Sequence, residues 1–466
     1  MKIELPDELN RMLRETPELA SAYVVGGSVR DALFGRECKD FDIECFGVSY
    51  EDLALALKKR GRTDLVGKSF GVVKLTTGSG ADYDFSIPRR DSKSGIGHKG
   101  FEIEFDPDIT PREAAMRRDF TINALMYDPR RDEVLDFFGG THDIENRVLR
   151  HVSDAFSEDP LRVLRGMQFA GRFELTAARE TVELCRGIKD SYTELAVERV
   201  CEEWFKWAAK SRKPSRGILF LESTGWLEHF PEIADLRDTP QDPEWHPEGD
   251  VLTHTCHCLD AMAELGGWHE SDEQTRIALM LGILAHDFGK PETTKEEFRR
   301  GRMCIVSPGH DELGVLLSEN FLHRINAPHM FRLRVPHFVK NHLAHLQSSS
   351  ARAVRRLAQR LKPATIEELC LIIQADHNGR PPKPPKVPDG VIALLERAKD
   401  LKLQDEAPRP ILLGRHLIER GMQPGKEFGE ILKGAFEAQL DGEFEDLDGA
   451  RRWLDLRSGA SSSEPA

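Results

Sequence analysis

The chain lacks the features of a membrane, secreted or disulfide-stabilised protein. Its longest apolar run, residues 278–285, is far too short to cross a bilayer. The N-terminal MKIELPDELN has neither the apolar core of a signal peptide nor the Arg- and Ser-rich pattern of a transit peptide. The eight cysteines include no C-x-x-C pair, which favours reduced thiols over a disulfide framework. We therefore expect a cytoplasmic protein without membrane contact.

Positive charge is also scarce. The 466 residues include 65 Lys and Arg against 79 Asp and Glu, a net charge of −14. Nucleic-acid binding usually comes with a basic domain, so composition alone argues against a general RNA or DNA binder. Basic clusters at 162–172, 206–216 and 352–362 leave open a basic stripe on an acidic body. The length predicts three or four domains.

The chain is organised around residues 23–44, YVVGGSVRDALFGRECKDFDIE. A short apolar run ends in Gly26 and Gly27, and Arg30 follows in a helix-like segment. A glycine pair at the end of a strand lets backbone N–H groups approach phosphates closely, and an arginine neutralises them. This half of the stretch therefore predicts a phosphate site.

The second half of the stretch carries carboxylates. Asp40 and Asp42 are spaced D-x-D on a β-type run, so their side chains project to the same face. Oxygen ligands of this kind suit Mg²⁺, which takes its other ligands from water and phosphates. Asp84, on the strand-like run 82–87, is a candidate third carboxylate. Phosphate and metal groups together predict nucleotidyl transfer.

The rest of residues 1–140 reads as mixed α/β. Composition predicts a helix at 50–60 and strands at 70–76 and 82–87. Residues 88–100, PRRDSKSGIGHKG, have no apolar periodicity and predict a mobile loop. In RRDFTINA, Arg117 and Arg118 at a helix start can hold phosphate oxygens. Asp119 and Asn123 lie one helical turn apart, on one face, and can contact the ribose.

A helical region follows and opens with EDPLRVLR. Asp159 and Arg162 project from the first turn of a helix that has Pro160 near its N-terminus. A carboxylate acceptor beside a guanidinium donor can imitate the hydrogen-bonding edge of a nucleic-acid template. The spacing alone is also typical of a local Asp–Arg pair at a helix N-terminus.

Taken in order, GGSVRD, KDFDIE, RRDFTINA and EDPLR resemble the motifs of class II tRNA nucleotidyltransferases and bacterial poly(A) polymerases, of the polymerase-β-like superfamily. The resemblance implies an α+β nucleotidyltransferase head and an all-α neck. It implies Mg²⁺ on Asp40 and Asp42, and CTP and ATP chosen by Asp159 and Arg162. Arg165 should also face the nucleotide, and the loop at 88–100 should help the pocket change from CTP to ATP.

The second half carries a separate set of metal-ligand side chains. An adjacent His-Asp pair flanked at a distance by His and Asp resembles the signature of HD-type phosphohydrolases. Imidazole and carboxylate together bind Ni²⁺, Mn²⁺, Co²⁺ or Mg²⁺, and such a metal activates water toward phosphoesters. The set comprises His254, His286, Asp287 and Asp376, with His310 and His342 where two-metal versions have extra ligands. Cys258, one turn after His254, leaves zinc as an alternative, but no second ligand pair of that type is evident.

These patterns predict four domains. They are a nucleotidyltransferase head at 1–141, a helical neck at 142–235, an HD domain at 236–385 and a helical RNA-binding tail at 386–466 with a disordered end. The Pro- and Asp-rich residues 231–247 and the run PPKPPKVP read as linkers.

The leading interpretation is template-independent addition of CCA to the 3′ end of tRNA, with a second phosphohydrolase activity. The partners would be tRNA, CTP and ATP, and a homodimer is a further possible assembly. Alternatives are a bacterial poly(A) polymerase, an enzyme that adds only CC or only A, and an HD phosphohydrolase with a regulatory head. The intact D-x-D carboxylates and the intact HD set argue against an RNA-binding scaffold without activity.

Overall fold

The computed structural model describes residues 3–38, 40–64, 71–93, 101–299 and 301–460. Contacts between Cα atoms divide the chain into two compact units, Met1–His229 and Phe230–Ala466. The predicted finer division into four domains stays a prediction. Among the described residues, no helix has the length and apolar character needed to cross a membrane.

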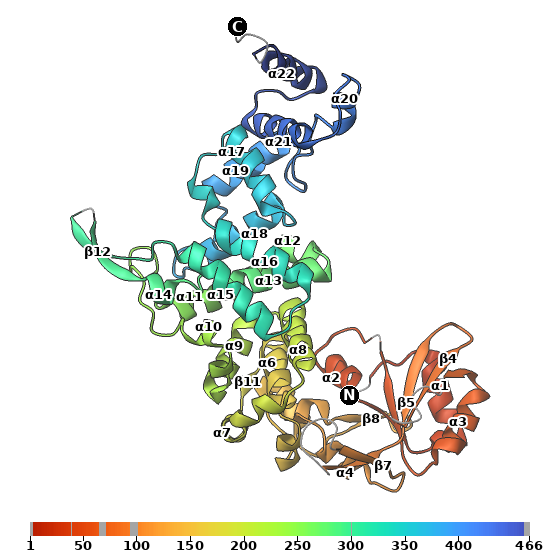
Figure 1. Ribbon diagram of the computed structural model, residues 1–466. Coiled ribbons are helices and arrows are strands. Elements are labelled where there is room, and N and C mark those ends of the chain that lie inside the picture. The colour runs from red at the N-terminus through yellow and green to blue at the C-terminus, as the bar shows by residue number, and fades with distance from the viewer. Residues whose placement is uncertain (1–2, 39, 65–70, 94–100, 300, 461–466) are drawn as a thin grey trace. The chain divides into compact units, whose positions relative to one another are not determined.

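A mixed seven-stranded sheet forms the first half of the first unit, which confirms the predicted α/β character (Figure 1). Its order is β3-β4-β5-β2-β1-β8-β9, and β2 and β5 are parallel. Apolar residues alternate along β4 and β5, so Val73, Leu75 and Phe85 are buried on one face. The strands are β1 (Ala22–Val25), β2 (Asp42–Cys45), β3 (Gly61–Asp64), β4 (Val72–Thr77), β5 (Asp82–Ser86), β8 (Met126–Asp128) and β9 (Glu133–Leu135).

Short helices connect the strands. The predicted helix at 50–60 is α3 (Tyr50–Lys58), and Ser49 caps it by accepting from the Asp52 N–H. The other helices of this half are α1 (Asp7–Glu15), α2 (Gly27–Leu33), α4 (Pro111–Met116) and α5 (Gly140–Glu145).

The predicted loop at 88–100 is partly wrong. Arg89–Lys93 forms strand β6, which pairs with β7 (Phe101–Phe105) as an antiparallel hairpin. The backbone ladder requires no apolar alternation, so the charged composition of this segment concealed the strand. Residues 94–100 lie outside the described residues, and the predicted mobility there stays a prediction.

The second half of the first unit is helical, apart from the short parallel pair β10 (Val148–Leu149) and β11 (Thr176–Ala177). Helix α6 (Leu161–Phe173) packs against α8 (Val197–Lys210) and α9 (Pro214–Thr224). The helices approach closely because Gly166 faces Phe220, where a Cβ would lie 2.7 Å from the ring. Helix α7 (Arg179–Gly187) completes this bundle.

The second unit is a succession of helices with one hairpin, β12 (Lys295–Arg299) and β13 (Arg302–Val306), visible in Figure 1. The predicted linker at 231–247 is wrong at its start, because α10 (Pro231–Ala234) is a helix whose Ile233 is fully buried. Proline at the first helical position starts a helix as readily as it breaks one. The other helices are α11 (Val251–Glu264), α12 (Gly266–Glu270), α13 (Glu273–Ala285), α14 (Lys290–Thr293), α15 (His310–Arg324), α16 (His329–Asn341), α17 (Ala351–Leu361), α18 (Ile366–Asn378), α19 (Asp389–Asp400), α20 (Gly414–Ile418), α21 (Lys426–Asp441) and α22 (Leu447–Ala460).

Candidate functional site

Three carboxylates gather at the centre of the seven-stranded sheet. Asp42 on β2 is the register partner of Asp84 on β5, so the two residues lie side by side. Asp40 stands two residues before Asp42, and all three are exposed. Partial loss of solvent raises the pKa of Asp42, as do Asp84 and Asp40, whereas Arg118 works in the opposite direction. A divalent cation would relieve this repulsion, so the donor set fits Mg²⁺.

The glycine turn lies directly against these carboxylates. Gly26 has a φ of +71°, which side-chain-bearing residues rarely adopt. A Cβ at this position would lie 3.4 Å from Arg118 Nη1 and 3.7 Å from Asp42 Oδ2. The turn therefore brings bare backbone beside a cation and a carboxylate, as the sequence predicts for a phosphate site.

Replacing Gly26 with alanine is expected to lower the free energy of unfolding of the first unit by about 1–2 kcal/mol. The reason is the left-handed backbone conformation, which penalises a Cβ. Urea unfolding followed by tryptophan fluorescence measures the change. Gly78→Ala is the matched control, because Gly78 has open space around its Cβ position. Equal stability of the two variants would contradict the strain argument.

Arg30 is buried, and its predicted role at the phosphates stays a prediction. It ion-pairs with Asp31 at 2.7 Å and donates to Asn123 Oδ1 at 2.6 Å. Burial lowers its pKa, although Asp31 works in the opposite direction. Asp31 also pairs with Arg172 of α6 at 3.1 Å. The arginine of the GGSVRD motif is therefore fixed by the RRDFTINA motif and linked to the helical half.

Asp119 is a buried centre of hydrogen bonds. Its Oδ2 accepts from Arg165 at 2.7 Å, and its Oδ1 accepts from the Asn123 amide at 2.9 Å. Burial works to raise the pKa of Asp119, but the charge of Arg165 and these hydrogen bonds bring it below the ordinary value. The carboxylate thus stays ionised and orients Arg165 on α6. The sequence assigned Asp119 and Asn123 to the ribose, and their contacts here are to each other and to arginines.

Asp159 and Arg162, the predicted base-recognition pair, have contacts of their own. Arg162 donates to the backbone oxygens of Ala155 and Arg117 at 2.7 and 2.9 Å. Asp159 accepts from Arg199 on α8 at 3.0 Å and from the Leu161 N–H at 3.1 Å. Both side chains are therefore held in place, on one wall of a pocket.

That pocket, of about 490 Å³, joins the predicted motifs in the first unit. Besides the glycine pair, it brings together Asp42, Arg118 and the base-recognition pair. The sequence interpretation missed a row of polar side chains from α8. Their spacing of three or four residues puts them on one helix face. The amphipathic pattern of this helix in the sequence contains that spacing. The full lining is Gly26, Gly27, Arg30, Asp42, Arg117, Arg118, Asp119, Asn123, Asp159, Leu161, Arg162, Arg165, Arg199, Glu202, Glu203 and Lys206.

A second site in the other unit collects all six predicted metal ligands. His286, His310 and His342 each bond through Nδ1 to the backbone oxygen three residues earlier, at 2.7 Å. A carbonyl can only accept, so each Nδ1 donates its proton and each Nε2 is the ring atom left for a metal. Second-shell hydrogen bonds orient metal-ligating histidines in this way.

Asp287 lies at the centre of the histidines. Its Oδ2 is 3.1 Å from His286 Nε2 and 3.6 Å from His254 Nε2, while its Oδ1 is 3.6 Å from His310 Nε2. His310 Nε2 and His342 Nε2 are 3.2 Å apart. Asp376 Oδ1 stands 3.2 Å from His254 Nε2. Donor atoms therefore converge from several helices on one small volume.

The donors fit a divalent metal. His286 Nε2 and both oxygens of Asp287 are buried without a well-directed hydrogen bond, although Lys290 Nζ forms an ion pair 2.7 Å from Oδ2. Burial lowers the pKa of His342 to about 4, so its imidazole is neutral at pH 7. Burial works to raise the pKa of Asp376, but Arg380 and His254 bring it well below the ordinary value. Neutral imidazole and charged carboxylate are the ligand states that metal binding needs.

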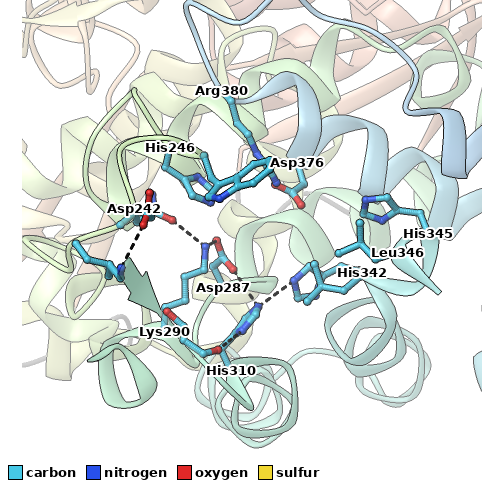
Figure 2. A pocket seen from close by; sticks show the side chains of 15 residues that line it. Asp242, His246, Asp287, Lys290, His310, His342, His345, Leu346, Asp376 and Arg380 are labelled. Carbon is cyan, nitrogen blue, oxygen red and sulfur yellow. Dashed lines mark hydrogen bonds and ion pairs between the residues drawn. The ribbon is translucent and has the colours of Figure 1, made fainter. Parts of the chain in front are cut away.

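A pocket of about 490 Å³ opens onto this cluster, and Figure 2 shows its side chains. Lys290 and Arg380 add positive charge beside Asp287 and Asp376. Neither was predicted from the sequence, because a single cation carries no distinctive pattern.

Cys258 lies beside the metal ligands, as the zinc alternative requires. Its Sγ is 3.4 Å from His254 Nε2 and is fully buried. Four donor atoms lie within 4.8 Å of one another, one each from His254, Cys258, His286 and Asp376.

Comparison with known proteins places the chain in a family. Residues 22–150 match the poly A polymerase head domain. The chain is 35% identical over 373 residues to the multifunctional CCA protein of Cupriavidus metallidurans, covering 77% of this chain and 84% of that protein. It is 36% identical over 371 residues to the multifunctional CCA protein of Xanthomonas campestris pv. campestris (strain B100), covering 77% and 85%.

Solved structures share the fold. The Bacillus stearothermophilus CCA-adding enzyme in complex with CTP matches 98% of this chain and 99% of its own, with a TM-score of 0.66 and 20% identity. The Thermotoga maritima CCA-adding enzyme complexed with tRNA matches 97% and 96%, with a TM-score of 0.59 and 19% identity. These likenesses confirm a nucleotidyltransferase head with a mixed sheet, followed by a largely helical remainder. With the two curated relatives, they lead to one conclusion: the chain belongs to the family of the multifunctional CCA proteins.

Proposed function

We propose that the chain adds CCA to the 3′ end of tRNA without a nucleic-acid template, using CTP and ATP. The observation that carries the proposal is the side-by-side placement of Asp42 and Asp84, with Asp42 lining the pocket that also holds Asp159 and Arg162. Its relatives are named for CCA, and solved enzymes of the same fold are described with CTP, ATP or tRNA. Metal carboxylates and base-reading groups are the two requirements of such a reaction.

In the proposed reaction the tRNA 3′-hydroxyl attacks the α-phosphorus of the nucleotide. The new P–O bond forms as the bond to the β-phosphate breaks, and pyrophosphate leaves. Asp40, Asp42 and Asp84 would hold Mg²⁺. With Mg²⁺ bound there, the phosphate charge is neutralised and the pKa of the attacking hydroxyl is lowered.

The chain's own residues position the triphosphate. Gly26 and Gly27 let phosphate oxygens approach the backbone, and Arg118 stands at the same turn. Arg165, held by Asp119, supplies a second guanidinium from α6. Arg30 also lines this pocket, and its Nη2 lies 3.5 Å from the Cβ position of Gly27.

Asp159 and Arg162 choose the base in this proposal. The guanidinium of Arg162 has more N–H donors than the two used by Ala155 and Arg117. The carboxylate of Asp159 likewise has lone pairs beyond those used by Arg199 and Leu161. The N–H groups and lone pairs that are already used hold the two side chains in place. The unused N–H groups and lone pairs face the base.

Replacing Arg199 with alanine is expected to reduce discrimination between CTP and UTP by about tenfold, because a charge-assisted hydrogen bond orients Asp159. The ratio of kcat/KM for the two nucleotides measures the effect. Arg179→Ala is the control, since Arg179 is exposed and pairs only locally with Glu183 among its described contacts. An unchanged ratio in Arg199→Ala would show that Asp159 needs no support from α8.

One assay separates the alternatives for the first unit. Purified protein is incubated with tRNA that ends before CCA and with each labelled triphosphate, singly and together. CCA addition predicts two cytidines followed by one adenosine. Incorporation that stops after CC, or that requires a preformed CC end, identifies a partial enzyme. A homopolymer grown from ATP on unrelated RNA would overturn the proposal in favour of a poly(A) polymerase.

We further propose that the second unit is an HD-type phosphohydrolase. The convergence of His254, His286, Asp287 and Asp376, with His310 and His342 beside them, supports this second activity. These residues would hold one or two divalent metals, with Ni²⁺, Mn²⁺, Co²⁺ and Mg²⁺ as candidates. A bound metal there supplies an acidified water for attack on a phosphoester. Lys290 and Arg380 would bind the phosphate oxygens.

A further inference from the structure

The segment before α11 places one carboxylate between two histidines. The side chain of Glu248 is fully buried, with 0% exposure. Its Oε1 lies 2.9 Å from His246 Nδ1 and 2.7 Å from His254 Nδ1. The two imidazoles stand edge to face, with ring centroids 4.6 Å apart. A single oxygen therefore contacts the same ring atom of both histidines.

This contact orients both rings. A carboxylate oxygen accepts hydrogen bonds, so the Nδ1 atom of each ring donates to Glu248 and each Nε2 atom faces away from it. His254 Nε2 faces Asp376 in the metal cluster.

His246 occupies a different place from His254. It lines the pocket above Asp287, together with Lys290, and Figure 2 draws it at the pocket wall. Its Nδ1 is used by Glu248, so Nε2 is the ring atom that can accept a hydrogen bond from a molecule in the pocket. None of the six predicted ligands has this position, half-buried at the wall.

The backbone around Glu248 holds it in place. Gly249 adopts a φ of +129°, which side-chain-bearing residues rarely adopt, and its carbonyl accepts from the Gln241 amide at 3.2 Å. Asp250 then caps α11 by accepting from the Thr253 N–H. Glu248 is thus anchored to the start of the helix that carries His254.

We propose that His246 is a further catalytic residue of the phosphohydrolase site and that Glu248 is the positioning residue that aligns both His246 and the metal ligand His254. The proposal rests on the phosphohydrolase activity proposed above. His246 Nε2 accepts a hydrogen bond from the water that attacks phosphorus and so orients it. Glu248 acts only through the two imidazoles.

Two variants test these roles against two readouts. Hydrolysis of p-nitrophenyl phosphate with saturating Mn²⁺ gives kcat and KM, and absorption spectra during Co²⁺ titration give the metal affinity. His246→Ala is expected to lower kcat by about 10²-fold with KM and Co²⁺ affinity unchanged. Glu248→Gln is expected to weaken Co²⁺ binding by about 10–100-fold and to lower kcat as well. His269→Ala and Glu270→Gln, on the exposed face of α12, are the matched controls.

The outcomes separate the proposal from its premise. Unchanged kcat in His246→Ala overturns its catalytic role, and so does a loss of Co²⁺ affinity as large as that of Glu248→Gln. Unchanged Co²⁺ affinity in Glu248→Gln overturns the positioning role. If the wild-type protein hydrolyses no p-nitrophenyl phosphate with Mn²⁺, Co²⁺ or Ni²⁺, the proposed activity itself fails on that probe. The Co²⁺ titrations would still decide the role of Glu248, and urea unfolding like that of the wild type would confirm the folding of the variants.

Discussion

Replacing Asp42 with asparagine is expected to lower nucleotide addition to tRNA by at least about 10³-fold. The carboxylate stands beside Asp84 on the neighbouring strand and lines the nucleotide pocket. Removing one charged metal ligand forfeits several kcal/mol of transition-state stabilisation. Incorporation of labelled CTP into tRNA that ends before CCA measures the loss. Hydrolysis of p-nitrophenyl phosphate should be unchanged.

The control for this variant lies on the same sheet. Asp82→Asn changes an exposed carboxylate of β5 that contacts Thr76 and Lys74 instead of the pocket. It should retain nucleotide addition within about twofold, as expected for a surface change of a few tenths of a kcal/mol. Comparable losses in Asp42→Asn and Asp82→Asn would mean that nucleotide addition depends on the overall negative charge of this sheet and not on a specific metal site.

The paired change His286→Ala with Asp287→Ala has the second large expected effect. It removes two convergent donors from the buried cluster, so phosphoester hydrolysis should fall by more than about 10³-fold. Co²⁺ binding to the second unit should be lost in parallel. Nucleotide addition should stay at the wild-type level, because its proposed residues lie in Met1–His229. The two assays on each purified variant make the measurement.

Substitution on an exposed helix face provides the comparison. Glu319→Ala with His323→Ala removes the same two side-chain types, an acid and an imidazole, from the surface of α15. This variant should retain both activities. If the His286 and Asp287 variant loses nucleotide addition as well, the two activities are not separable. If it keeps phosphoester hydrolysis, the metal cluster is not the hydrolytic site.

In the head, the predicted site residues depended on motifs whose members lie close in sequence. Asp40 and Asp42 follow from a strand period of two, and the structure places the predicted Asp84 beside Asp42 as its register partner. The mixed sheet of the head follows from the same alternation. Strand β6 did not follow, because its residues are charged and its pairing with β7 depends on a segment farther along the chain.

Residues that act through distant partners were beyond sequence reasoning. Arg199 contacts Asp159 from 40 residues away, through the packing of α8 on α6. The partners of Glu248, His246 and His254, are near in sequence, but their contact depends on how the chain bends before α11. Arg30 was predicted at the phosphates, but its burial against Asp31 and Asn123 depends on the tertiary fold. Periodicity locates a side chain on its element and says little about which other element meets it.

The ion pairs that join the head to the first neck helix have an evolutionary consequence. Asp119 relies on Arg165 and Asp31 pairs with Arg172, so a recombination event near residue 141 would leave the buried Asp119 without Arg165 and the half-buried Asp31 without Arg172. Such an uncompensated buried charge costs several kcal/mol. We therefore expect exchange between homologous genes to be tolerated better near His229 and Phe230, where the compact units meet in sequence. We expect the sheet and the first helices behind it to be inherited together, as one block.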